Sequence, residues 1–364
     1  MQQTLFALLM LMRNNEGIAT IKAVAVLAII MIAAIGASFT LKPTLASPSS
    51  QNTLVDLAGR TVTIPQSVNR IVVLQSYWAE ISCTLGAAEK IVGIGKDVAT
   101  SVFLPQYVTN KTNVGSLFSG INIETIVALN PDVVITDFGY GKAAETIQAL
   151  ESLNITVVAL TASSFKDHLS AITIIGKVLK ADLKAEALVN YLENQYSALI
   201  SVSSKIPDSS KPRVLICNLD VWGQGLIYAY SNSSYGRAVV DAGGINVAYS
   251  EFPDQSSPKV NLEKILAWNP DIIIVTGREN SSLSNQLNLM EGTAWTQLKA
   301  YQEGKVYTLL NGAKDRASYY DWTPRMIVGL YQVAKIIHPD LYSGINATAL
   351  AAFLMQNYYG YLNS

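Results

Sequence analysis

The chain has few of the side chains that hold metals or form cross-links. Among its 364 residues there are two cysteines, Cys83 and Cys217, and two histidines, His168 and His338. Each histidine stands without a second His or Cys at the spacing of a metal ligand set. We therefore expect no metal held directly by protein side chains, and no resident cofactor.

The scarcity of cysteine has two further consequences. No Cys lies near the end of the apolar run in the first 50 residues, which excludes a bacterial lipoprotein anchor at that place. Cys83 falls in a helical stretch and Cys217 in an apolar strand, and such thiols are more often buried small hydrophobic residues than disulfide partners. Whether the two interact is left open.

Charge and catalytic motifs are also sparse. The net charge is −1 and the pI is about 6.2, so no basic field favours nucleic acid. No G-x-S-x-G, H-E-x-x-H or P-loop occurs. Gly139 to Ala144 fits a G-x-G-x-x-A dinucleotide fingerprint, but the next strand ends in Leu160-Thr-Ala-Ser without the expected acidic residue. The sequence thus disfavours an enzyme, and an exported α/β enzyme or a surface scaffold remains the alternative.

The N-terminal region indicates export. Residues 23–41 carry no charge, with Arg13 and Lys22 before them and Lys42 after. This pattern predicts that residues 1–47 form a signal peptide or an N-terminal membrane anchor, and cleavage is left open. We expect an extracytoplasmic protein, periplasmic or at the cell surface. Five sequons accompany the export signal, with glycosylation undecided, at Asn110, Asn154, Asn232, Asn280 and Asn346.

A long internal repeat dominates the rest of the chain. Residues 121–139 (INIETIVALNPDVVITDFG) align with residues 260–278 (VNLEKILAWNPDIIIVTGR), an offset of 139 residues (260 minus 121). This spacing is too long for a solenoid unit. It indicates two similar lobes, and a cleft between two lobes is a common place for a small ligand.

Short apolar runs alternate with helical patterns in both halves, which predicts parallel sheets covered by helices. We predict an α/β fold with two Rossmann-like lobes, joined by a single long α-helix that begins near Asp182, with the ligand cleft between the lobes. The predicted parts are an N-terminal lobe at 48–180, a linking helix at 181–205, a C-terminal lobe at 206–340 and a helical tail at 341–364.

Several motifs resemble one transport family. They are Asp56 to Pro65, Arg70-Ile-Val-Val-Leu, Leu85-Gly-Ala with Ile91 to Ile94, the repeated Asn-Ile/Leu-Glu…Asn-Pro-Asp block, and Thr323-Pro-Arg before a helix that ends near Pro339. Together they resemble the substrate-binding proteins of ABC importers for iron–siderophore complexes, haem and cobalamin. The resemblance implies a monomer that captures a metal chelate and delivers it to a permease dimer. Siderophore, haem and corrinoid stay open as ligands.

Candidate ligand residues follow the predicted strands, because open α/β sheets bind ligands at the carboxyl ends of their strands. Aromatic loops suit a large flat chelate, and arginines suit its anionic groups. The candidates are Tyr77, Trp78, Phe118, Phe138, Tyr140, Trp222, Arg278, Arg316, Tyr320 and Trp322.

Glu124 and Glu263 are the candidate docking residues. Each follows an Asn that predicts a helix N-cap, so a first-turn carboxylate is favourable there whatever its role. The resemblance implies that residues at these positions dock into arginine pockets of the permease, one from each lobe.

Overall fold

The computed structural model describes residues 52–139, 141–219, 227–277, 290, 294–310 and 323–363. The chain divides into two units, Met1–Gln51 and Asn52–Ser364, and the description below concerns the second. Within the described ranges no helix is long and apolar enough to cross a membrane.

The N-terminal lobe is built on a five-stranded parallel sheet. Its strands are β3 (Ile71–Val73), β4 (Ile91–Ile94), β5 (Thr112–Asn113), β8 (Val133–Asp137) and β9 (Val157–Leu160), in the order β5-β4-β3-β8-β9. The chain moves outward from β3 through β4 to β5 and then restarts at β8 on the other side of β3. The direction in which successive strands are added to the sheet therefore reverses between β3 and β8.

Both faces of this sheet are buried, which explains the continuous apolar runs of its strands. Ile71 and Val73 face a core that also contains residues of α3 (Ser76–Thr84) and α7 (Phe165–Leu179). Val72 and Leu74 point the other way, into a core shared with α5 (Ile123–Ala128) and α6 (Ala143–Ser152). Smaller elements complete the lobe: β1 (Thr53–Val55), β2 (Thr61–Thr63), β6 (Gly115–Ser116), β7 (Gly120–Ile121), α4 (Gln106–Thr109), η1 (Ala88–Lys90) and η2 (Val98–Thr100).

The C-terminal lobe is also built on a sheet with parallel central strands, but one edge of its sheet is antiparallel. Its sheet contains β10 (Arg213–Asn218), β11 (Ile227–Ala229), β12 (Ile245–Asn246), β13 (Lys259–Val260), β14 (Ile272–Gly277) and β15 (Val306–Leu310). The strands β12, β14 and β15 continue the parallel pairing around β10, whereas β11 and β13 pair antiparallel at one edge. The helices are α9 (Ser234–Asp241), α10 (Leu262–Trp268), α12 (Lys299–Gln302) and α13 (Met326–Ile337), with η3 (Asp208–Ser210) and η4 (Ala294–Gln297).

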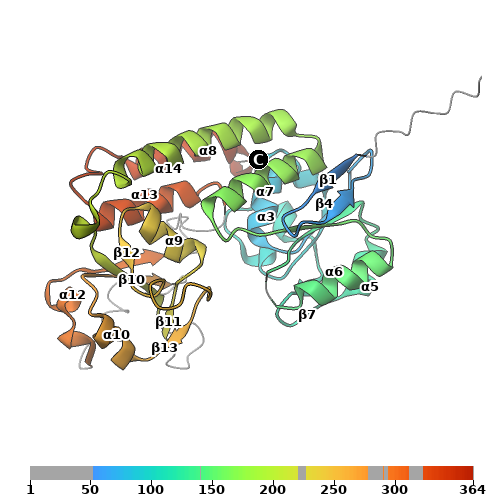
Figure 1. Cartoon of the computed structure of the whole chain (residues 1–364). Helices are drawn as coiled ribbons and strands as arrows, with labels where there is room; N and C mark the ends of the chain where they lie inside the picture. Colours follow the sequence, from blue (N-terminus) through green and yellow to red (C-terminus); the bar gives the residue numbers. More distant parts are fainter. Residues whose placement is uncertain are drawn as a thin grey trace, which may run out of the picture. The chain divides into compact units, whose positions relative to one another are not determined.

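The long helix expected near Asp182 is α8 (Asp182–Ser203), with 22 residues. It contacts α7 of the N-terminal lobe and α9 and α13 of the C-terminal lobe, and Figure 1 shows it running along both lobes. The tail contains α14 (Ala347–Tyr358) and η5 (Gly360–Asn363). Two lobes with central parallel sheets joined by one long helix confirm the predicted fold class.

Candidate functional site

The best-described part of the predicted cleft is the edge of the N-terminal sheet where β3 and β8 end. β3 and β8 are the neighbouring strands between which the order of strand addition reverses. Loops that follow two such strands separate from each other, and ligands of open α/β sheets bind in the crevice that results. The corresponding strands of the C-terminal lobe are β10 and β14, and the segments that follow them, at 220–226 and 278–289, lie outside the described residues.

Asp137 organises the N-terminal edge from the last position of β8. Its Oδ1 accepts a hydrogen bond from the Gly139 amide at 2.7 Å, and its Oδ2 accepts one from the Tyr77 hydroxyl at 3.1 Å. The Asp137 amide in turn donates to Gln75 Oε1 at 2.9 Å. This network ties the segment after β3 to the turn after β8. Burial raises the pKa of the Asp137 carboxyl, and the hydrogen bonds from Gly139, Tyr77 and Phe138 oppose that rise.

Two phenylalanines, Phe118 and Phe138, lie near this network. Phe118 is 72% exposed. Its neighbour Leu117 accepts a hydrogen bond from the Lys142 amide at 2.8 Å, so the loop of Phe118 packs on the turn after β8. Phe138, in the same turn, is half-buried. The two phenylalanines thus lie at the edge of the sheet, and their contact with a ligand stays a prediction.

Gly141 makes this packing possible. Its φ is +58°, and a Cβ on it would lie 2.5 Å from the Leu117 carbonyl oxygen. Only glycine fits such an approach without strain. The contact accounts for a glycine of the G-x-G-x-x-A motif without any dinucleotide.

Trp78 is a correction to the predicted ligand set. Its side chain is 0% exposed and packs in the core with Ile71 and Val73. Trp78 was selected because it follows a strand, but α3 begins at Ser76 and turns the indole inward. Tyr77 is also buried, and its role in this structure is the hydrogen bond to Asp137.

Six of the predicted ligand residues lie outside the described residues: Tyr140, Trp222, Arg278, Arg316, Tyr320 and Trp322.

Glu124 and Glu263 occupy equivalent helix starts in the two lobes. The Asn122 side chain accepts from the Thr125 amide at 2.9 Å at the start of α5, and the Asn261 side chain accepts from the Lys264 amide at 2.9 Å at the start of α10. Both glutamates are exposed in the first turn. Their carboxylates are therefore supported by the helix dipole and open to a partner.

The Asn-Pro-Asp part of the repeat has a structural role that the sequence reading missed. Asp132 Oδ2 accepts from the Arg70 amide at 2.8 Å, and Asp271 Oδ2 accepts from the Arg213 amide at 2.9 Å. The arginines donate back to the end of the preceding helix, Arg70 to Leu129 and Arg213 to Trp268. Each Asp–Arg contact thus holds the end of a helix against the start of a central strand, β3 in the N-terminal lobe and β10 in the C-terminal lobe. The recurrence of Arg before both opening strands was the available signal.

The titratable groups elsewhere do not form a metal site within the described ranges, where no group of three His, Cys, Asp or Glu side chains could hold an ion. His168 is fully buried, and this burial lowers its pKa to about 3 although the Thr323 backbone opposes the shift. His338 Nε2 lies 3.0 Å from the Gly243 carbonyl oxygen. Both cysteines are buried free thiols.

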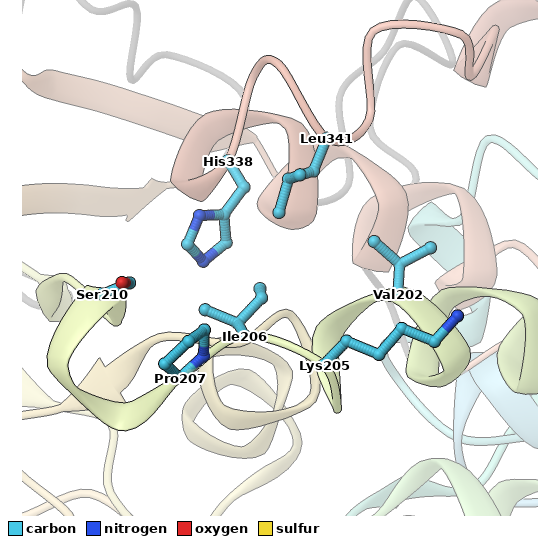
Figure 2. Close-up of a pocket in the computed structure, with 7 residues that line it drawn as sticks. All are labelled: Val202, Lys205, Ile206, Pro207, Ser210, His338 and Leu341. Atoms are coloured by element: carbon cyan, nitrogen blue, oxygen red, sulfur yellow. The ribbon is translucent and has the colours of Figure 1, made fainter.

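A groove of about 400 Å³ lies away from the sheet edges, beyond the C-terminal end of α8 (Figure 2). Its lining is mostly apolar: Val202, Lys205, Ile206, Pro207, Ser210, His338 and Leu341. The strand ends of neither lobe contribute to it, so we do not assign it to the cleft.

A family model for periplasmic binding proteins matches residues 71–311, which is more than half of the chain. The chain belongs to the periplasmic binding protein family. The match includes both copies of the repeat and the sheet edges of both lobes.

Relatives of known name cover most of the chain. It is 26% identical over 335 residues to the molybdate-binding protein MolA of Haemophilus influenzae, covering 84% of this chain and 90% of that protein. It is 26% identical to the ABC transporter substrate-binding lipoprotein YvrC of Bacillus subtilis, covering 80% of this chain and 86% of that one. Shorter matches of 26% identity, over 60% of this chain and 57% of the relative, are to cobalamin-binding proteins of Halobacterium salinarum.

Solved structures agree on the fold. A periplasmic solute-binding protein of Veillonella parvula superposes with a TM-score of 0.67 at 25% identity, covering 85% of this chain and 93% of that one. MolA with bound molybdate gives a TM-score of 0.69 at 23% identity, covering 84% and 97%. The haem-binding protein RhuT of Roseiflexus gives 0.61 at 20% identity, covering 76% and 100%.

Proposed function

We propose that this protein captures a metal chelate outside the cytoplasm and delivers it to the permease of an ABC importer. Membership of the periplasmic binding protein family and the naming of YvrC as an ABC transporter component support the transport role. The cobalamin-binding and haem-binding relatives are those whose ligands fit the proposed chelate. The best candidates are a ferric siderophore, haem or a corrinoid.

The choice of a chelate rests on the two phenylalanines at the sheet edge, of which Phe118 is exposed and Phe138 half-buried. Phe118 exposes 72% of its area in a loop packed on the turn that carries Phe138. Aromatic rings favour a large flat or apolar ligand through area and stacking. The buried carboxyl of Asp137 adds no attraction for an anion at the same edge.

A molybdate-like oxyanion is the second candidate, because the MolA match extends over 84% of the chain. A doubly charged oxyanion needs donors or cations to replace its water. Arg278 and Arg316 remain proposals for that purpose, as they do for the acidic groups of a chelate.

Calorimetry with hemin, ferrichrome, cyanocobalamin and sodium molybdate separates the two candidates. We expect one of the three chelates to bind and molybdate to give no heat. Phe118→Ala is expected to weaken chelate binding by roughly tenfold, the loss of about 1–1.5 kcal/mol of aromatic contact. Phe353→Ala, at a 41% exposed ring on α14, is the matched control and leaves affinity unchanged. Heat of binding with molybdate, and none with any of the three chelates, would contradict the proposal.

Glu124 and Glu263 are proposed to meet arginines of the permease, one lobe to each half of a dimer. Their exposure and the equivalent geometry of α5 and α10 support this role. Trp222, Tyr140, Tyr320 and Trp322 are retained as proposed ligand contacts on the facing loops. The protein is proposed to act as a monomer, held at the membrane through residues 1–47 where these are not cleaved.

A further inference from the structure

One buried ion pair connects the two lobes. Glu80 lies on α3 of the N-terminal lobe, and Arg325 directly precedes α13 of the C-terminal lobe. Arg325 Nε donates to Glu80 Oε1 at 2.8 Å and its Nη2 donates to Oε2 at 3.0 Å. Both side chains are about 1% exposed. Among ion pairs between described residues, only this one joins the lobes, and the others lie within one lobe or in the linker.

The pair is enclosed by aromatic side chains. The guanidinium carbon of Arg325 lies 3.3 Å from the centroid of the Phe103 ring. The Tyr359 hydroxyl donates a hydrogen bond to Glu80 Oε1. The Tyr361 hydroxyl donates to the Phe103 carbonyl oxygen at 3.2 Å. The C-terminal tail therefore returns from α13 to the N-terminal lobe and covers the pair.

The linking helix α8 packs on α7 of the N-terminal lobe and on α9 and α13 of the C-terminal lobe. A further connection lies away from α8, formed by the ion pair of Glu80 with Arg325 and by Tyr359 of the C-terminal tail. A bidentate Arg–carboxylate contact restricts direction as well as distance. A buried ion pair adds little net stability relative to well-packed apolar side chains, so geometry is the better account of its presence.

We propose that Glu80 and Arg325 are positioning residues that fix the angle between the lobes and hence the width of the cleft. The proposal deepens the proposed function, since that cleft is the proposed chelate site. It makes no use of a ligand, however, and the experiment below needs none.

The test is the distance between nitroxide labels on the two lobes, measured by pulsed electron paramagnetic resonance on the full chain. Glu145→Cys on α6 and Ala267→Cys on α10 supply exposed label sites, and Cys83 and Cys217 are buried against labelling. The wild-type background is expected to give one narrow distance distribution. Arg325→Lys keeps the positive charge but cannot form the bidentate contact with the Glu80 carboxylate. We therefore expect a broader distribution of label-to-label distances.

Arg60→Lys is the matched control. Arg60 also contacts a carboxylate, that of Asp56 at 2.6 Å, but both residues lie in the N-terminal lobe. We expect its distance distribution to match wild type. The proposal requires the distance distribution of Arg325→Lys to be broader than that of Arg60→Lys.

A second variant covers the case in which Arg325→Lys does not fold. Glu80→Leu combined with Arg325→Met removes both charges and leaves apolar volume, a replacement that buried ion pairs commonly tolerate. We expect this variant to fold and to show the broader distribution. A wild-type distribution in either folded variant overturns the proposal, because packing alone would then hold the lobes. Failure to bind any chelate would leave this result unaffected and would count only against the proposed function.

Discussion

Burial of the His168 side chain makes the stability of the fold depend on pH. Its ring is 0% exposed on α7, and this burial lowers its pKa from an ordinary 6.5 to about 3. Between these pH values the unfolded chain binds a proton that the folded chain excludes. The stability contributed by neutral His168 is therefore complete above pH 6.5 and is lost as the pH falls toward 3.

We predict that His168→Gln flattens the fall in unfolding free energy between pH 6.5 and about 4. Over this range of about 2.5 pH units the contribution removed is about 3.5 kcal/mol as an upper bound, because each tenfold change in proton affinity corresponds to about 1.4 kcal/mol. Denaturant unfolding at several pH values measures it. Burial raises the pKa of Asp241 to about 6 and gives a slope of opposite sign, so the variant is compared with wild type. Equal slopes in the two proteins would refute the prediction.

Gly141 gives a second prediction at the scale of one residue. Gly141→Ala places a Cβ 2.5 Å from the Leu117 carbonyl oxygen at a φ of +58°, whereas Gly304→Ala shares a positive φ of +66° and meets nothing within 4 Å. Backbone strain alone costs about 1 kcal/mol in each. We expect Gly141→Ala to lower the unfolding free energy by more than Gly304→Ala and to weaken chelate binding through Phe118. Equal losses would mean that the loop of Leu117 moves aside freely.

At the scale of elements, the repeated Asp fastens helix to strand in both lobes. Asp132 Oδ2 accepts from the Asn69 and Arg70 amides, and Asp271 contacts the Arg213 amide and the Lys299 ammonium. We predict that Asp132→Ala and Asp271→Ala each lower the unfolding free energy by about 1–3 kcal/mol, because backbone donors lose their acceptor. Chemical denaturation measures the change. The exposed Asp254→Ala, as control, is expected to stay within about 0.5 kcal/mol of wild type. A loss no larger than in that control would show that water replaces the carboxylate.

The sequence predicted elements best where the repeat set both pattern and boundaries. The helices α5 and α10 and the strands β8 and β14 lie as expected, because an Asn cap and an Asn-Pro stop are local signals. α7 was overlooked although Ser164 caps it and a long apolar face marks it. The antiparallel strands β11 and β13 have three and two residues, and strands so short are fixed by pairing with β10 and with each other, which no local pattern encodes.

The candidate site was predicted less well than the fold. Position after a strand locates a loop but not the direction of a side chain, so Trp78 was expected at the cleft although its side chain is buried. The ligand role of Phe118, an exposed residue in the loop before the first repeat, stays a prediction. The Asp137 network was missed, because its partners Gln75 and Tyr77 are about 60 residues away in the chain. The role of Arg325 depends on Glu80, which is 245 residues distant.

At the scale of the whole molecule, the account requires ligand capture and delivery to be separable. The proposed chelate contacts lie at the strand ends, whereas Glu124 and Glu263 lie at the starts of α5 and α10. Exposed first-turn carboxylates contribute up to about 1 kcal/mol to folding. In a desolvated contact with arginines the same groups are worth about 2–5 kcal/mol to the complex.

The most direct measurement of the central claim is chelate uptake into proteoliposomes that contain the cognate permease, with wild-type protein and with Glu124→Ala combined with Glu263→Ala. The account predicts that wild type supports uptake, and that the double variant binds the chelate and melts nearly as wild type does but supports none. Glu145→Ala, at an exposed first-turn glutamate of α6, is the matched control and retains uptake. Full uptake by the double variant, or loss of its chelate affinity, would contradict the account.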